Sequence, residues 1–201
     1  EVPGELEYAG RGVSYCAVCD GAFFKGETLA VIGGGDAAVE EADYLTRYAS
    51  QVHVVHRRDE FRASKMLQER LFANPKIDVI WNKKVTELKG GPAGLQSVEL
   101  EDTVTGDRSS LPATGSFIFI GFRPNTGLVK EHFTHDPAGY MITDDRMMTS
   151  IPGLFAAGDV RAQLTRQITT AVGDATTAAI AVEKYLAERR SRSDAKAKVG
   201  V

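Results

Sequence analysis

Cys16 and Cys19 are the only cysteines of this 201-residue chain, and their spacing points most directly to chemistry. A zinc site would need four ligands, and neither a second Cys-x-x-Cys pair nor a suitably spaced histidine pair completes one. Two inert thiols are a second interpretation, whereas Cys-x-x-Cys beside a βαβ pattern is typical of a redox dithiol. We favour the dithiol, with Asp20 next to the second sulfur as proton donor or acceptor. We expect the pair to precede the first strand of the fold.

A glycine-rich turn follows the first predicted strand, Thr28–Ile32, and opens a predicted helix over residues 36–48. In dinucleotide-binding turns of the pattern G-x-G-x-x-A, the first glycine permits the tight turn and the second lets a pyrophosphate approach the backbone. The small last residue lets helix and strand pack closely, and the first helical amides face the phosphates. The context predicts dinucleotide binding, although glycine clusters also serve turns alone. The turn reads Gly33-Gly34-Gly35-Asp36-Ala37-Ala38.

A basic cluster stands where the second predicted strand ends. NAD-binding units place an acidic residue near this point for the ribose 2′-hydroxyl, but here the residues are His56, Arg57 and Arg58, with Arg62 shortly after. Guanidiniums hold a phosphate by charge-assisted, forked hydrogen bonds. The cluster predicts that NADPH is preferred to NADH, each arginine contributing on the order of 1–3 kcal/mol. The alternative is a solvated loop whose arginines pair with the two carboxylates that follow Arg58.

The elements that position these residues follow from hydrophobic periodicity. Helical spacing recurs after the glycine turn and over residues 62–73, where Asn74-Pro75 ends the pattern. Short apolar or alternating segments, typical of strands, occupy Thr28–Ile32, Gln51–His56 and Ile77–Trp81. Strand, helix, strand, helix, strand with short links is the βαβαβ unit of a nucleotide-binding half. We therefore predict an α/β fold with a Rossmann-like parallel sheet.

The later part of the chain has a different pattern of apolar segments and turns. Strand-like segments at 85–89, 97–101 and 117–120 are separated by tight turns, which predicts an antiparallel meander added to the parallel sheet. A domain boundary is expected near Pro124, giving an NADPH-binding domain over 1–124 and part of a second domain over 125–187. The second part contains a predicted strand, Leu154–Gly158, and a predicted helix from about Ile168 to Glu188. Residues 188–201 lack apolar periodicity and are expected to form a flexible tail.

Composition excludes several classes of protein. With 43% hydrophobic and 25% charged residues, the chain is neither disordered nor a disulfide scaffold. Its net charge is −3 and its basic residues gather at the C-terminal end, so we expect no nucleic-acid binding by the acidic body. The longest apolar stretches fall far short of the ~20 residues of a membrane helix, and the acidic N-terminus is unlike a signal peptide. We expect a cytoplasmic protein that does not associate with membranes.

A dithiol beside an NADPH site raises a chemical difficulty. NADPH delivers a two-electron hydride, which disulfides do not readily accept, and a flavin is the usual intermediary. The flavin takes the hydride and reduces the disulfide through its ring. We therefore expect FAD as a second cofactor, bound elsewhere in the chain.

Five motifs in one order carry a resemblance to a known family, namely Cys16–Gly21, Val31–Asp36, His56–Arg62, Phe155–Asp159 and Arg166-Gln167. Over nearly all of residues 4–187 the chain resembles the low-molecular-weight, bacterial-type thioredoxin reductases, which depend on NADPH and FAD. The resemblance implies that the two cysteines form the redox disulfide and that the adjacent aspartate assists proton transfer.

The resemblance also implies cofactor-binding roles for particular residues. Those implied for NADPH are Gly33, Gly35, Asp36, Ala37, His56, Arg57, Arg58 and Arg62. Asp159 is implied to contact the ribityl chain of FAD. Arg166, Gln167 and Ile168 are implied to lie beside the isoalloxazine ring.

Thioredoxin as protein substrate and a homodimer are further implications of the resemblance. The family begins with an FAD-binding half that carries its own G-x-G-x-x-G, and only fifteen residues precede Cys16. We therefore expect the N-terminal part of that domain to be missing, and FAD to bind this chain weakly. Two alternatives stay open. The first is a non-catalytic NADPH-binding module without flavin. The second is the flavoprotein subunit of an alkyl hydroperoxide reductase, whose relatives tend to use NADH.

Overall fold

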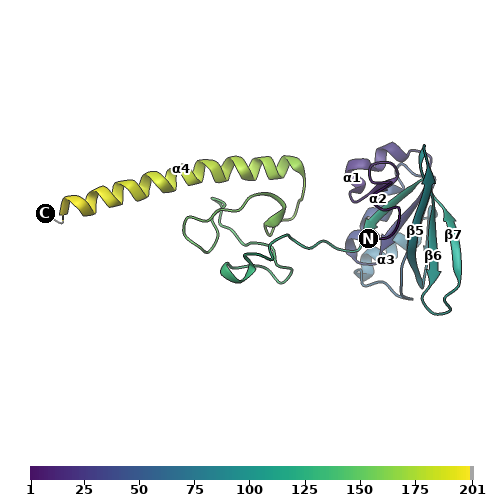
Figure 1. Ribbon diagram of the computed structural model, residues 1–201. Coiled ribbons are helices and arrows are strands. Elements are labelled where there is room, and N and C mark those ends of the chain that lie inside the picture. The colour runs from purple at the N-terminus through teal and green to yellow at the C-terminus, as the bar shows by residue number, and fades with distance from the viewer. Residues whose placement is uncertain (200–201) are drawn as a thin grey trace. The chain divides into compact units, whose positions relative to one another are not determined.

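A five-stranded parallel sheet organises the first part of the computed structural model, which describes residues 1–199 (Figure 1). The glycine turn and the basic cluster follow the carboxyl ends of two neighbouring strands, where open α/β sheets bind ligands. Helix α2 (Asp36–Leu45) connects β2 to β3, and α3 (Lys65–Ala73) connects β3 to β4, so the predicted βαβαβ unit is confirmed. The strands, in spatial order, are β1 (Val13–Ser14), β8 (Gly115–Phe119), β2 (Thr28–Gly33), β3 (Gln51–Val55) and β4 (Ile77–Ile80).

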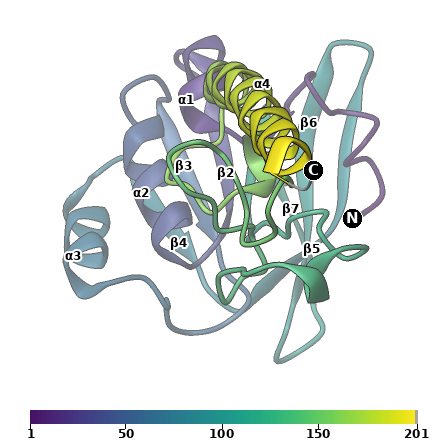
Figure 2. The ribbon, with the colours of Figure 1, turned by 90° about the vertical axis from the view of Figure 1, so that its left-hand side faces the viewer.

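Both faces of this sheet are covered, which explains why its strands read as apolar runs. Leu29 and Val31 of β2 pack in a core with residues of α2 and α3. Ala30, on the opposite face of β2, packs in a second core with Leu88 and Val98. This second core is closed by a separate antiparallel sheet of β5 (Lys83–Gly91), β6 (Gly94–Asp102) and β7 (Arg108–Pro112). Figure 2 shows the helices on one side of the parallel sheet and the antiparallel strands on the other.

The structure corrects the strand assignments around the meander. The segment predicted over 117–120 as a meander strand is β8, which pairs in parallel with β1 and β2. Its side chains are buried on both faces, as a central parallel strand requires, whereas the third meander strand, β7, is mostly exposed and lacked an apolar signal. The short strand β1 also precedes the cysteines, so the expectation that the pair precedes the first strand is wrong.

The second compact unit begins at Phe122, immediately after the first unit ends at Gly121. It consists of loops, two short 3₁₀ turns, η2 (Lys130–His132) and η3 (Gly158–Val160), and the long helix α4 (Ile168–Val199). The strand predicted over Leu154–Gly158 does not form; Phe155 makes a single bridge to Met148. An apolar run becomes a strand only beside an extended neighbour, and the described part of this unit offers no longer pairing at that place.

Helix α4 continues beyond Glu188, where the sequence predicted its end. Alanine, arginine and lysine dominate this stretch, and all three favour helix without needing an apolar face. The last two residues of the predicted tail, 200–201, lie outside the described residues. Among the helices that the structure describes, none combines the length and apolar character needed to cross a bilayer.

Candidate functional site

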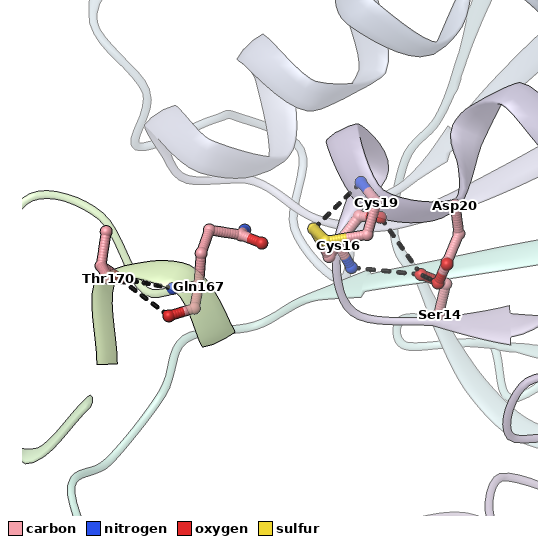
Figure 3. Close-up of a disulfide and its surroundings, with 6 residues drawn as sticks. All are labelled: Ser14, Cys16, Cys19, Asp20, Gln167 and Thr170. Atoms are coloured by element: carbon pink, nitrogen blue, oxygen red, sulfur yellow. Dashed lines mark hydrogen bonds between the residues drawn. A yellow bond between two sulfur atoms is a disulfide. The ribbon is translucent and has the colours of Figure 1, made fainter. Parts of the chain in front are cut away.

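Cys16 and Cys19 form a disulfide, with their Cα atoms 5.3 Å apart (Figure 3). Cys16 is the N-cap of the short helix α1 (Ala17–Asp20), and the Cys19 amide donates a hydrogen bond to the Cys16 sulfur at 3.2 Å. One helical turn therefore brings the two sulfurs together. Cys16 is half-buried and Cys19 is exposed. The arrangement can open and close by thiol–disulfide exchange with a partner that approaches from solvent.

Ser14, at the end of β1, links the disulfide loop to Asp20 (Figure 3). Its hydroxyl donates to a carboxylate oxygen of Asp20 at 2.6 Å and accepts from the amide of Cys16 at 3.1 Å. Ser14 is only 4% exposed, so water competes little for these bonds. Ser14 was not among the residues predicted from the sequence. The available signal was a serine two residues before a cysteine, a spacing typical of side-chain-capped turns.

The three glycines after β2 have different surroundings. A Cβ on Gly33, whose φ is +155°, would lie 2.5 Å from the Phe119 carbonyl oxygen and 2.7 Å from the Ala38 Cβ. A Cβ on Gly34 would lie 2.3 Å from the His56 ring. A Cβ on Gly35 would meet no described atom within 4 Å beyond its chain neighbours and its own helix. The first two glycines are therefore required by the fold, while the third keeps the start of α2 open.

A cavity of about 510 Å³ opens at this turn, within the first unit. Apolar side chains of the parallel sheet, including Ile32, Val55 and Ile118, line one part of it. Arg58 is the one residue predicted for NADPH that does not line the cavity. The predicted residues that do line it are Gly33, Gly35, Asp36, Ala37, His56, Arg57 and Arg62.

The guanidinium groups at this cavity and beside it have no paired carboxylate among the described residues. Arg57, Arg58 and Arg62 are exposed, and none of their side chains forms an ion pair or a hydrogen bond with the side chains and backbone that the structure describes. The paired loop considered as an alternative is therefore absent from the described chain. By contrast, Lys83 and Lys84, which also line the cavity, pair with carboxylates at 2.9 and 2.6 Å. The arginines are thus the cations available to an anionic ligand.

His56 and Asp36 contact residues that flank the glycine turn. Burial lowers the pKa of His56 below its ordinary value, and the two following arginines act in the same direction, against backbone hydrogen bonds that raise it. The His56 ring packs against Phe61 and Trp81, with ring centroids 5.4 and 6.1 Å away. The Asp36 carboxylate accepts from the Ser64 amide at 2.7 Å. In this structure both side chains hold the loops around the glycine turn in place.

The residues predicted for FAD lie in the second unit. Asp159 is exposed on η3, and Ile168, the first residue of α4, is 85% exposed. Arg166 stacks its guanidinium over the Tyr140 ring at 4.1 Å, and its Nε atom is buried without a partner among the described residues. The Thr170 hydroxyl donates to the Gln167 carbonyl at 2.8 Å and closes the start of α4 (Figure 3).

A half-buried ion pair fixes the turn that carries Asp159. Arg161 and Asp174 are 2.7 Å apart, and each side chain is 13% exposed. Asp174 also accepts from the Gly158 amide at 3.1 Å, and Arg161 donates to the Thr143 hydroxyl at 2.8 Å. The pair therefore ties both ends of η3 to α4. Local sequence patterns did not predict this pair, because its partners are distant in the chain: Asp174 meets Gly158 sixteen positions away, and Arg161 meets Thr143 eighteen positions away.

Comparison with known proteins is consistent with this geometry. The chain is 51% identical over 194 residues to a thioredoxin reductase of Listeria innocua, covering 96% of this chain and 61% of the relative. It is 52% identical over 193 residues to a thioredoxin reductase of Bacillus subtilis, covering 93% and 59%. The crystal structure of thioredoxin reductase from Streptococcus pyogenes superposes with a TM-score of 0.88 at 54% identity, covering 93% of this chain and 61% of that one.

The chain therefore spans about three fifths of the length of the relatives that it matches. A family model, described as pyridine nucleotide-disulphide oxidoreductase, matches residues 1–175. That match includes the disulfide, the glycine turn and the basic cluster, and reaches into α4. The chain belongs to the pyridine nucleotide-disulphide oxidoreductase family.

Proposed function

We propose that this chain carries the NADPH-binding and dithiol parts of a thioredoxin-disulfide reductase. Electrons pass from NADPH through FAD to the Cys16–Cys19 disulfide and on to thioredoxin. The observation that carries the proposal is that one compact unit contains both an accessible disulfide and a nucleotide-type glycine turn beside arginines without an ion pair among the described side chains. The similarity to proteins named thioredoxin reductase supports the choice of substrate.

The surroundings of the glycine turn fit NADPH. Gly35 leaves the backbone at the start of α2 unobstructed, and helix amides there favour negative charge. The exposed guanidiniums of Arg57 and Arg62 line the same cavity and suit a ribose 2′-phosphate. Arg58 is assigned a weaker, longer-range role because it does not line the cavity.

The residues at the start of α4 fit a flavin. Asp159 presents an exposed carboxylate that suits ribityl hydroxyls, on a turn fixed by the Arg161–Asp174 pair. Arg166, Gln167 and Ile168 would lie beside the isoalloxazine, where the N-terminal end of α4 favours negative charge on the reduced ring. When bound, FAD would supply the two-electron relay between the nicotinamide and the disulfide.

The chain's own cysteines perform the last transfer. In the reduced dithiol, one thiolate attacks the disulfide of thioredoxin, forming a mixed disulfide and releasing one partner thiolate. The second cysteine thiolate then attacks the mixed disulfide, which re-forms Cys16–Cys19 and releases the second partner thiolate. Two electrons pass to thioredoxin, and its two thiolates take up two protons. Asp20, held by Ser14, is the proton donor or acceptor beside Cys19.

The proposal also assigns the parts of the chain. Residues 1–124 bind NADPH and carry the dithiol, residues 125–187 form the C-terminal part of an FAD-binding domain, and residues from 188 onward take no part in the chemistry. We propose a homodimer in the cytoplasm, acting without nucleic acid or membrane.

A two-stage experiment tests this function. The chain is first reduced chemically, freed of reductant and mixed with oxidised thioredoxin, and the transferred thiols are counted. We expect one dithiol transferred per chain, and none from Cys16→Ser or Cys19→Ser. Failure of this transfer by a folded, fully reduced chain would overturn the assignment of the cysteines.

The second stage adds NADPH, FAD and excess oxidised thioredoxin, and follows NADPH absorbance. Continuous oxidation that requires both cysteines supports the full reaction. Binding of NADPH without turnover supports a non-catalytic module, and a preference for NADH supports the peroxide-reductase subunit; either result would overturn the proposed electron path for this chain.

A further inference from the structure

The main chain of the basic cluster is held from behind by a corner of the antiparallel sheet. Three consecutive carbonyls, those of His56–Arg58, each accept one hydrogen bond from this corner. The donors are, in order, the Lys83 amide at 3.0 Å, the Thr103 hydroxyl at 3.1 Å and the Asn82 amide at 3.1 Å. The loop that presents the arginines is therefore fixed by residues distant in sequence.

Thr103 is the centre of this corner. Its amide donates to the Asn82 carbonyl at 2.8 Å, and its hydroxyl lies 3.2 Å from the same carbonyl and 3.1 Å from that of Arg57. Asn82 has a φ of +55°, a conformation that needs support from its neighbours. Asp102, which precedes Thr103 in the chain, forms an ion pair with Lys83 at 2.9 Å. Thr103 thus supplies the only side-chain donor to the three carbonyls among the described residues.

The main-chain position from which the Arg57 side chain extends depends on this support. Arg57 lines the cavity, and no ion pair or side-chain hydrogen bond restrains it in the described part of the chain. The main chain therefore fixes only the point from which this side chain extends. A forked contact to a phosphate forms more readily when that point is held in place. Loss of the bond to the Arg57 carbonyl loosens that starting point without altering the glycine turn.

We propose that Thr103 is a positioning residue that sets the preference for a 2′-phosphorylated nucleotide. It acts through the Arg57 carbonyl and makes no contact with the nucleotide. The inference rests on the proposed function, because it assumes that NADPH binds at the glycine turn. NADPH and NADH differ only in the 2′-phosphate, so the contribution of Thr103 is confined to NADPH.

The test compares nucleotide affinities in the full 201-residue chain. Thr103→Val keeps the branched shape and removes the hydroxyl, while Thr103→Ser keeps the hydroxyl. Fluorescence titration should show NADPH binding about three- to tenfold weaker in Thr103→Val, the effect of one lost hydrogen bond, with NADH changed less than about twofold. Thr103→Ser should restore the wild-type ratio. Thr105→Val is the matched control, because that hydroxyl bonds Asp107 in the same turn at 2.7 Å.

The outcomes separate this inference from the function on which it rests. A wild-type chain that binds neither nucleotide overturns the nucleotide site and the inference together. A wild-type chain that binds both equally overturns the proposed preference for NADPH and, with it, the inference. A wild-type chain that prefers NADPH, with Thr103→Val keeping the same ratio of affinities, overturns the inference alone. The same holds if both nucleotides are lost equally, or if Thr103→Ser or Thr105→Val behaves like Thr103→Val.

Discussion

Replacing Gly33 by alanine tests whether the glycine turn is dictated by packing, by ligand approach or by both. The added Cβ would stand 2.5 Å from the Phe119 carbonyl oxygen, a backbone atom of the neighbouring strand, and 2.7 Å from the Ala38 Cβ. Neither is the far end of a flexible side chain, so β8 or α2 must shift. Such overpacking costs about 1–3 kcal/mol, and a non-glycine residue in a sparsely populated backbone region costs about 1–3 kcal/mol more. We expect Gly33→Ala to lower the free energy of unfolding by about 2–6 kcal/mol.

Gly35→Ala is the matched control in the same turn. Gly35 has a φ of −94°, and nothing lies within 4 Å of its added Cβ. Its replacement at the N-cap should change the stability by less than about 1 kcal/mol. The new methyl group stands where the pyrophosphate is expected to approach, so NADPH binding should weaken about tenfold or more.

Urea unfolding followed by tryptophan fluorescence measures the difference. Trp81 is the only tryptophan, and its ring lies 4.4 Å from that of Phe61 in the first unit, so its emission reports the unfolding of that unit. With a denaturant slope of about 1–3 kcal/mol/M, Gly33→Ala should lower the urea midpoint by about 1 M or more. Equal stability of Gly33→Ala and wild type would refute the packing argument. Equal NADPH affinity of Gly35→Ala and wild type would refute the ligand argument.

The other predictions concern single side chains in both units. Arg57→Gln should weaken NADPH binding about tenfold or more and Arg58→Gln less, because only Arg57 lines the cavity; the comparison of dissociation constants checks this. Asp174→Asn leaves Arg161 without its partner and should lower stability by about 3 kcal/mol, near the low end for a buried pair because each side chain is 13% exposed; calorimetry measures it. Hydrogen bonds from the Thr105 amide and Lys83 lower the pKa of Asp102 to about 2, so its stabilising contribution is present above pH about 4 and lost as pH falls towards 2. In urea midpoints measured along that range, the difference between wild type and Asp102→Asn should shrink as pH falls.

Local patterns in the sequence were sufficient for the βαβαβ unit. Strands β2 and β3, the intervening helix and the glycine turn are specified by neighbours within a few positions, and each was predicted within a few residues of its bounds. The assignment of residues 117–120 was different. A short apolar run is compatible with either sheet, and only pairing with β2, more than eighty positions earlier, decides that β8 is parallel.

The site was predictable where a residue type carries the chemistry itself. The cysteine pair was recognised because Cys-x-x-Cys is typical of a redox pair, and the two residues form a disulfide. The NADPH-binding role of the arginines stays a prediction, and Arg57 and Arg62 line the cavity. Ser14 and Thr103 were missed because each acts through a hydrogen bond whose partner is chosen by the fold, in one case 46 positions away. Arg58 was predicted to bind NADPH together with Arg57 because both belong to one loop. Of these two residues, only Arg57 lines the cavity.

The hydroxyl of Ser14 has a single proton and two acceptors within reach. The hydroxyl oxygen lies 2.6 Å from the Asp20 carboxylate oxygen and 3.4 Å from the carbonyl oxygen of Cys16. Because a hydroxyl donates one proton, the shorter contact to the Asp20 carboxylate and the longer contact to the Cys16 carbonyl are alternatives. Ser14 therefore joins the aspartate to the peptide backbone of the cysteine loop, and a residue without a hydroxyl at this position would remove the donor of both contacts.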